Sequence, residues 1–383
     1  MNIKRSINKR IDRILGKKKE ITPTRIINLY HTTYNRSVLI SYITTPFTTV
    51  NQLTHQNYIT SHIIAESFST LGYNVDIVDF HDQRPITYEK YSVIFGFGKG
   101  LEQSFYFKDR SIPRINFVTG AHHYLQNEMS LKSIKDFYQI SGLWLANEAN
   151  VLSDCNYYSM FNADFAIMLA HGHVHKDYQS RFEQKVYSLN NNILNAFSGF
   201  KTKDMNSRSK NFLFLSGPKQ ITKGLHILLE VAKTREDLNF FVVVPFINDE
   251  LENYYSEILE NKNVFLYKNL RMDSEDMKNI VESCSYCVAP SYIDGLPGGT
   301  LEPMSAGLIP IVSKYCGFPN EEFIFEMEDL SPKGLNDTIN KVLALDDTTY
   351  MKHSNAIKEY ACEKFSPHYV KQELLRILKE RNL

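Results

Sequence analysis

Short strand-like runs alternate with helix-like runs along most of this sequence. In the first half, apolar runs at 38–43, 74–80, 91–95, 114–118 and 165–169 have strand character, and the patterns at 57–71 and 129–149 are helical. Gly72 falls where the first of these helices ends, just before a run rich in β-branched residues. This alternation predicts βαβ units around a parallel sheet, so we expect an α/β fold.

The second half repeats the alternation more clearly. Strands are predicted at 212–217, 239–244, 264–267, 286–289 and 309–313. The run at 240–244 is continuously apolar, as parallel strands covered on both faces require. A polar stretch at 196–210 has no periodicity and predicts a linker. We therefore expect Rossmann-like domains at 21–195 and 211–365, with ligands beyond the carboxyl ends of their strands.

Length and composition agree with two soluble globular domains. The chain has 383 residues, and 43 basic residues balance 43 acidic ones, which does not indicate a nucleic-acid-binding protein. Five cysteines scattered over a long chain predict a reducing, cytoplasmic environment without a disulfide framework. No apolar stretch approaches the roughly 18 residues that span a bilayer, and the N-terminus lacks the apolar block of a signal peptide.

Residues 1–20 predict a basic amphipathic helix. Ile3, Ile7, Ile11 and Ile14 recur at helical spacing, with Lys and Arg side chains between them. Such a helix can lie on an anionic membrane, which would place the protein peripherally at the inner face of the membrane. A solvated tail, or a helix packed on its own domain, explains the same pattern.

The segment 290–307 carries the most informative chemistry. It leaves a predicted buried strand, crosses a loop with Gly295, Gly298 and Gly299, and enters a short helix near Thr300. Glycines allow a backbone to approach a ligand closely, and a helix start presents free N–H groups to an anion such as a diphosphate. A simple Gly-Gly turn is the alternative for the loop taken alone.

Two carboxylates flank this loop, Asp294 before it and Glu302 in the predicted helix. A carboxylate can accept hydrogen bonds from two vicinal hydroxyls, so acidic side chains here suit ribose and hexose diols. Taken alone, Glu302 could equally be an acidic residue that complements a helix dipole.

The spacing of these residues resembles the retaining GT-B glycosyltransferases of family 4, the glycosyl transferases group 1. In that family, Glu-Gly, seven residues and a second Glu form the donor motif, and a Gly-x-Pro strand start follows. Asp294-Gly295 and Glu302 keep this spacing, and the segment 304–310 is similar to the continuation. Gly217 and Lys223-Gly224 match the family's Gly-Arg turn with its following Lys-Gly. The resemblance covers the second domain and is looser over the first.

The resemblance implies two Rossmann-like domains with parallel sheets facing across a cleft, and a C-terminal helix at 366–383 that crosses back to the first domain. It implies that Lys223 grips the diphosphate, that Glu302 holds the ribose hydroxyls and that Asp294 touches the hexose. The expected donor-binding residues are Gly217, Lys219, Lys223, Asp294, Gly298, Gly299, Thr300, Leu301 and Glu302.

Two positions depart from the family pattern. Pro218 stands where the family usually has Arg, and Asp294 stands where it usually has Glu. Lys219 lies one position further on and is our candidate for the missing phosphate-binding charge. The shorter Asp294 side chain predicts a slightly roomier sugar pocket or a change in which hydroxyl is recognised.

In the first domain, the segment 118–124 ends a predicted strand and faces the predicted cleft. Members of the family often carry Thr-Gly and a nearby His there, and Thr119-Gly120 precede two histidines here. The resemblance implies that His122 contacts sugar or phosphate, with His123 as the alternative. A histidine satisfied locally by backbone groups is the alternative interpretation of either residue.

Three other patterns predict structure rather than chemistry. The histidines at 171, 173 and 175 have no Cys or acidic partner beside them, and Cys284 and Cys287 form a lone Cys-x-x-Cys, so neither pattern predicts a metal site. The glycine-rich segment 96–100 is only superficially like a dinucleotide fingerprint and predicts a turn at a strand end. The sequence contains no Asp-x-Asp motif, which binds the metal ion in the other large glycosyltransferase fold. We therefore expect chemistry without a metal or other cofactor.

The sequence therefore predicts a glycosyltransferase that moves a hexose from a UDP- or GDP-sugar to a glycan or lipid-linked acceptor, with retention, in cell-surface polysaccharide synthesis. Its expected catalytic residues are His122, Lys223, Asp294 and Glu302. Electrostatic stabilisation of the leaving diphosphate should dominate. A nucleotide-sugar epimerase or hydrolase on the same fold is one alternative, and a non-catalytic sugar-nucleotide-binding protein is another.

Overall fold

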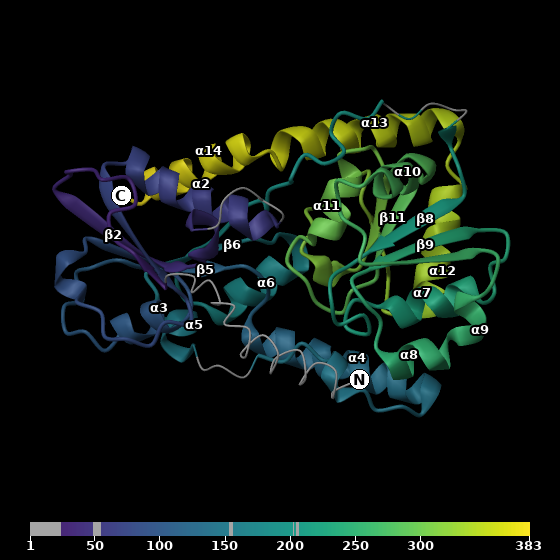
Figure 1. Ribbon diagram of the computed structural model, residues 1–383, viewed down its shortest axis with the longest axis horizontal. Helices are drawn as coiled ribbons and strands as arrows, with labels where there is room; N and C mark the ends of the chain where they lie inside the picture. The colour runs from purple at the N-terminus through teal and green to yellow at the C-terminus, as the bar shows by residue number, and fades with distance from the viewer. Residues whose placement is uncertain (1–23, 49–54, 153–155, 202, 204–206) are drawn as a thin grey trace, which may run out of the picture.

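Two α/β domains lie side by side in this computed structural model, each built around its own sheet (Figure 1). The structure describes residues 24–48, 55–152, 156–201, 203 and 207–383. The basic helix predicted at 1–20 lies outside these described residues. Among the helices that are described, none combines the length and the apolar composition needed to cross a bilayer.

The first sheet has the strand order β1-β3-β2-β4-β5-β6-β7, with β1 antiparallel to β3 and all other pairs parallel. Its central strands are buried along their whole length, because helices cover both faces. The order reverses between β2 and β4, which are neighbours. The strands are β1 (Arg25–Ile26), β2 (Arg36–Tyr42), β3 (Tyr73–Asp79), β4 (Val93–Gly96), β5 (Arg114–Val118), β6 (Phe165–Met168) and β7 (Val186–Ser188).

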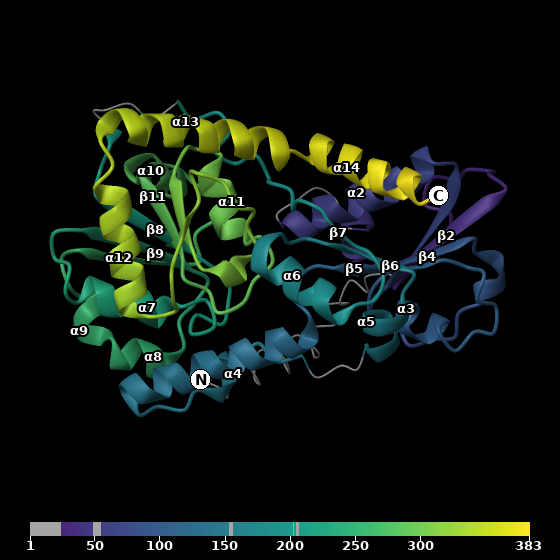
Figure 2. The ribbon, with the colours of Figure 1, turned by 180° about the vertical axis from the view of Figure 1, so that it is seen from behind.

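Helices of the first half connect these strands. α2 covers one face of the sheet, and α3, α5 and α6 lie on the other (Figures 1 and 2). The helical segments are η1 (Thr45–Phe47), α2 (Gln56–Thr70), η2 (Tyr88–Lys90), α3 (Lys99–Ser104), α4 (His123–Ser141), η3 (Ala146–Glu148), α5 (Tyr157–Asn162) and α6 (Gly172–Arg181).

The second sheet is wholly parallel, with the order β10-β9-β8-β11-β12-β13. Here the order reverses between β8 and β11. In a doubly wound sheet, ligands bind beyond the carboxyl ends of the strands at such a reversal. The strands are β8 (Asn211–Leu215), β9 (Asn239–Val244), β10 (Val264–Lys268), β11 (Tyr286–Ala289), β12 (Ile309–Val312) and β13 (Phe325–Glu326).

The second sheet is also covered on both faces. α10, α11 and α13 pack on one face, and α7 and α12 pack on the other. The helical segments are α7 (Leu225–Ala232), α8 (Asp249–Tyr254), α9 (Ser256–Leu259), α10 (Glu275–Ser283), α11 (Gly298–Met304), η5 (Lys314–Cys316), α12 (Pro332–Leu343), α13 (Asp347–Lys364) and α14 (Pro367–Glu380).

Two helices cross between the domains in opposite directions. α4 begins in the first domain but runs beneath the second, near α7 and α8 (Figures 1 and 2). Its Phe137 ring lies 5.7 Å from that of His226 in α7. α14 leaves the second domain and packs beside α2, where Leu374 and Ile377 join the apolar core of the first sheet. Each domain is therefore completed by a helix from the other half of the chain.

Several boundaries differ from the sequence prediction. α4 spans 123–141 rather than 129–149, because the His122 side chain caps its start and Gly142, with φ of 72°, ends it in a left-handed conformation. The predicted linker is not wholly exposed: Phe197 is buried in the core of the second domain, as is Ile193 just before it. The strands β1, β7 and β13 have only two or three residues each, too few for a periodic pattern.

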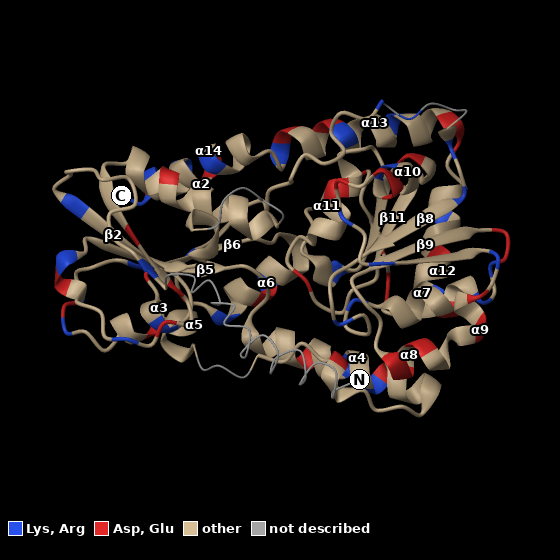
Figure 3. Ribbon diagram, in the orientation of Figure 1, with Lys and Arg blue, Asp and Glu red and all other residues tan. Residues whose placement is uncertain are grey.

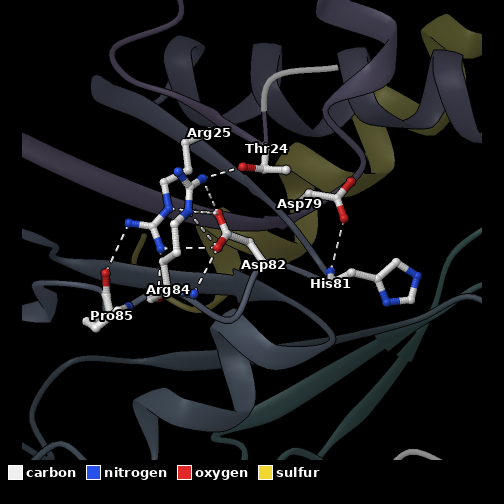
Figure 4. A network of polar contacts seen from close by, with 7 residues as sticks. All are labelled: Thr24, Arg25, Asp79, His81, Asp82, Arg84 and Pro85. Atoms are coloured by element: carbon white, nitrogen blue, oxygen red, sulfur yellow. Dashed lines mark hydrogen bonds and ion pairs between the residues drawn. The ribbon is translucent and has the colours of Figure 1, made fainter. Parts of the chain in front are cut away.

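The loop after β3 is fixed by a charged network at the edge of the first domain (Figure 4). Asp82 accepts hydrogen bonds from Arg84 and, over 2.8 Å, from Arg25. These hydrogen bonds hold the pKa of the Asp82 carboxyl well below its usual range, and those from Arg84 have the largest effect. Burial acts in the opposite direction and raises this pKa. Elsewhere basic and acidic residues are interspersed over both domains (Figure 3), with acidic residues in the first turn of α8.

Candidate functional site

A cavity of about 570 Å³ lies at the order reversal of the second sheet. The loops after β8 and β11 and the start of α11 form its second-domain wall. The first domain contributes Gln56 and Thr119 to the opposite wall, and the following segment contributes Asn191. We call it the second-domain cavity.

The second-domain cavity gathers nearly all the predicted donor-binding residues. Only Leu301 does not line it, because its side chain is fully buried in the core and its N–H donates to the Pro297 carbonyl. The predicted residues that do line it are Gly217, Lys219, Lys223, Asp294, Gly298, Gly299, Thr300 and Glu302.

Lys223 and Asp294 form an ion pair within this cavity, and about a fifth of each side chain is exposed. The second Asp294 oxygen accepts a hydrogen bond of 3.0 Å from the Gly295 N–H. The Lys223 charge is therefore compensated internally, and an incoming anion has to share or replace the carboxylate as its partner.

Glu302 is only 1% exposed, yet its carboxylate is well supplied with donors. It accepts hydrogen bonds from the backbone N–H groups of Leu194 and Ala196 and from the Gln56 side chain. Burial raises its pKa, and these hydrogen bonds oppose that rise. Because a carboxylate offers about four acceptor positions, this arrangement leaves acceptor capacity for a hydroxyl in the cavity.

Close packing against other parts of the protein explains why glycines occupy the loop between β11 and the start of α11. A Cβ on Gly295 would lie 2.9 Å from the Thr119 carbonyl of the first domain, and one on Gly299 would clash with the Leu215 carbonyl. A Cβ on Gly298 would clash with Gln56. The loop is thus pressed against β8 and against the first domain.

The turn after β8 is closed by residues that the sequence did not single out. The Glu148 carboxylate accepts a 3.2 Å hydrogen bond from the Ile221 N–H, and the Glu148 carbonyl accepts one of 2.8 Å from Thr222. Lys219, with φ of 70°, donates to the carbonyl of Asn147. First-domain groups therefore shape the turn that leads to Lys223.

α4 also holds the loop that carries Asp294. The Tyr292 hydroxyl donates a 2.8 Å hydrogen bond to Asp136 of α4 and lies 3.3 Å from His226. Burial raises the pKa of Tyr292 and lowers that of His226 to about 4, so both groups are neutral. No local sequence pattern marks Asp136, because its partner is 156 residues away.

A second cavity, of about 420 Å³, lies at the carboxyl ends of β3, β4 and β5 in the first domain. We call it the first-domain cavity. It adjoins the second-domain cavity, because the two share lining residues. The shared residues are Thr119, Asn150, Lys223, Asp294 and Gly295.

The two cavities adjoin, and residues of both domains line each of them. Residues 200–364 match the family Glycosyl transferases group 1. The chain thus carries a group 1 glycosyltransferase domain, and this match supports glycosyl transfer as its general activity. A search of curated proteins gives no significant match.

Solved structures share the architecture of most of this chain. Sucrose-phosphate synthase from Thermosynechococcus elongatus has a TM-score of 0.60 and 13% identity, covering 90% of this chain and 98% of that one. WaaG, a glycosyltransferase involved in lipopolysaccharide biosynthesis, has a TM-score of 0.54 and 13% identity, covering 89% and 99%. Anabaena Alr3699/HepE, solved with UDP and glucose, has a TM-score of 0.54 and 12% identity, covering 91% and 100%. The predicted GT-B fold is confirmed.

The two histidines at the start of α4 have different surroundings. His122 is fully buried, its Nδ1 accepts a 3.2 Å hydrogen bond from the Tyr124 N–H, and burial lowers its pKa to about 4. His122 lines neither cavity, contrary to its expected position, whereas His123 lines the first-domain cavity. His122 therefore caps α4, and His123 is the histidine of the pair that lines a cavity.

The remaining histidine and cysteine patterns have structural partners. His171 bonds Asn190 over 2.6 Å and His175 bonds the Val186 carbonyl over 3.1 Å, while His173 packs on Tyr315. Cys284 and Cys287 are buried and free, and burial raises the pKa of both thiols. Within the described part of the chain, no three His, Cys, Asp or Glu side chains are grouped as metal ligands.

Proposed function

We propose that this protein transfers a hexose from a nucleotide-diphosphate sugar to a hydroxyl of a glycan or lipid-linked acceptor, with retention of configuration. The observation that carries the proposal is that Lys223, Asp294 and Glu302 line one cavity at the order reversal of the second sheet. The group 1 domain match supports the same activity.

In this proposal the donor fills the second-domain cavity. Lys223 binds the diphosphate, with Lys219 as a second cation, and Glu302 accepts hydrogen bonds from the ribose hydroxyls. Asp294, which pairs with Lys223, contacts the hexose. The backbone at Gly298 and Gly299 contacts hexose and phosphate.

The reaction breaks the bond between the anomeric carbon and the diphosphate oxygen. The acceptor oxygen bonds to that carbon from the same face, and its proton leaves with the diphosphate. Negative charge grows on the leaving group, so the fixed cation Lys223 stabilises the transition state more than the ground state. Lysine charge, rather than a metal ion, balances the diphosphate in this proposal.

The nucleotide and the biological setting are inferred from the similar solved structures. HepE has been solved with UDP and glucose, which favours UDP as the first nucleotide to test. The described involvement of WaaG in lipopolysaccharide biosynthesis favours a cell-surface glycan as acceptor. We place the protein in the cytoplasm, with the basic segment 1–20 as a candidate attachment to the inner face of the membrane.

Calorimetric titration with UDP, GDP and their hexose derivatives tests the donor assignment. We expect one nucleotide to bind, and we expect Lys223→Ala to weaken it at least about tenfold, because a charge-assisted hydrogen bond is lost. Lys233→Ala, at the exposed C-terminal end of α7, is the matched control.

Turnover assays separate this proposal from its rivals. Transfer that needs an added acceptor and continues in EDTA supports a metal-independent transferase. Donor breakdown or isomerisation without acceptor would indicate a hydrolase or epimerase, and tight binding without turnover would indicate a binding protein.

A further inference from the structure

The glycine-rich turn at 96–100 is built tightly into the first domain and has no part in the proposed donor site. Gly96 has φ of 125° and Gly98 has φ of 77°, values that L side chains rarely adopt. A Cβ on Gly96 would clash with the Ser41 carbonyl, and one on Gly98 would clash with the Phe80 carbonyl. Only glycine fits at these two positions.

Hydrogen bonds fix this turn to the ends of two neighbouring strands. The Phe97 N–H donates a 3.0 Å hydrogen bond to the Ser41 carbonyl at the end of β2. The Ser41 hydroxyl in turn donates a 2.6 Å hydrogen bond to the Phe97 carbonyl. The Lys99 N–H donates over 2.9 Å to Phe80, in the loop that the Asp82 network anchors (Figure 4). The position of Lys99 is therefore set by the fold rather than by chance exposure.

Lys99 follows β4 at the order reversal of the first sheet. β3 and β4 lie on either side of β2, and ligands of doubly wound sheets bind beyond the carboxyl ends at such a point. The first-domain cavity occupies this place, and Lys99 lines it. The two domains thus present equivalent crevices, of which the donor uses only the second.

Among the described residues that line the first-domain cavity, one charged side chain has no ion-pair partner. Its charged lining residues are Lys99, Lys223 and Asp294, and the last two are paired with each other. Lys99 is partly buried and makes no ion pair or side-chain hydrogen bond within the described part of the chain. A partly buried lysine without a counterion is suited to bind an anion that comes from solution.

The rest of the lining suits a sugar-like body. Amide side chains of Asn116, Gln126 and Asn150 and the rings of Phe97 and Tyr178 line the cavity. Its volume of about 420 Å³ lies within the range of small-molecule sites.

We propose that the first-domain cavity binds the acceptor through an anionic group, a phosphate or a carboxylate, held by Lys99. The acceptor hydroxyl then faces the Lys223–Asp294 pair, which lines both cavities. This inference rests on the proposed function, because it assigns the acceptor class of the same reaction.

Binding of small anions to the protein saturated with UDP or GDP, whichever binds in the calorimetric titration, tests the inference, because the nucleotide occupies the other phosphate-binding cavity. The probes are inorganic phosphate, glucose 6-phosphate and glucuronate, with glucose as the neutral partner. We expect the anionic probes to bind at least about tenfold more tightly than glucose, and Lys99→Gln to abolish that preference. Lys108→Gln, an exposed lysine after α3, should keep it.

Flotation with vesicles identifies the source of the anion. Phosphatidylcholine vesicles are compared with vesicles that contain phosphatidylglycerol, again for the wild type, Lys99→Gln and Lys108→Gln. Anion binding in solution that depends on Lys99 supports a soluble acceptor, and vesicle binding that depends on Lys99 supports a lipid headgroup.

Two results distinguish a failure of this inference from a failure of the proposed function. If UDP or GDP binds but neither soluble anions nor anionic vesicles distinguish the wild type from Lys99→Gln, the anionic acceptor is rejected and the donor site stands. If no nucleotide binds at all, the proposed function itself fails.

Discussion

Buried charges in this protein are compensated largely by backbone groups and by residues distant in sequence. Glu302 accepts from the N–H groups of Leu194 and Ala196, more than 100 residues away. Glu148 accepts from the Ile221 N–H. A buried carboxylate that remains ionised needs such donors, because desolvation favours its neutral form. The spacing of Asp294 and Glu302 predicted a shared cavity, but their internal partners could not be predicted, since no local pattern encodes a contact of that range.

The buried His226 predicts a measurable pH dependence of stability. Its pKa is about 4 in the folded protein and 6.5 in an ordinary environment, because burial disfavours the charged ring. The unfolded chain therefore binds a proton that the folded chain refuses, so the free energy of unfolding falls as pH drops from 6.5 toward 4. The loss from this residue amounts to at most about 3 kcal/mol.

Urea unfolding at pH 7, 5.5 and 4.5 measures this effect. His226→Gln should show a shallower loss than the wild type, whereas His368→Gln, on an exposed position of α14, should not differ. Part of the slope should persist in His226→Gln, because burial also lowers the pKa of His122 to about 4. Equal slopes in the wild type and His226→Gln would contradict the assignment.

At the scale of elements, strands with continuous apolar runs were predicted most accurately. β5, β9 and β11 have the predicted bounds, because burial on both faces leaves an unbroken apolar signal. α4 was misplaced, because its buried side packs partly against the other domain and its N-cap is a histidine, which is not among the usual capping residues. What a helix packs against is decided by the tertiary fold.

α4 also positions the donor loop, which gives a prediction at this scale. Tyr292→Phe removes the hydroxyl that bonds Asp136 and meets His226, but it keeps the ring. We expect stability to fall by about 1–2 kcal/mol and the KM for the donor to rise several-fold, because the Asp294 loop loses its anchor. Tyr138→Phe, on the exposed side of α4, should change neither quantity.

The combination of readouts separates positioning from plain stability. Loss of stability with an unchanged KM would show that the Tyr292 hydroxyl stabilises the fold without shaping the site. A raised KM in both tyrosine variants would point away from Asp136.

At the scale of the whole molecule, the domains are joined by more than a linker. α4 and α14 cross in opposite directions, and the His171 N–H donates over 2.8 Å to the Gly317 carbonyl between α6 and the segment after η5. Motion between the domains must therefore bend or slide these contacts together. The sequence predicted two domains, but only the structure shows how far each depends on the other.

The apolar core of the first sheet should depend on α14. Leu374 is fully buried against this core, so Leu374→Ala should cost about 2–5 kcal/mol of stability. Hydrogen exchange should then rise in α2, which α14 covers, rather than in the second domain. Gln372→Ala, on the exposed side of α14, is the control. Faster exchange confined to the second domain would show that α14 belongs to that domain energetically.

The crossing of α14 also constrains the order in which the protein can mature on the ribosome. A nascent chain is made from its N-terminus, and domains usually fold as they emerge. Here the first sheet has been synthesised long before residues 367–380, so the part of α2 that α14 covers stays exposed while the entire second domain is translated. The first domain, although it is made first, therefore completes its core last. Chaperones can bind the exposed surface of α2 during this interval.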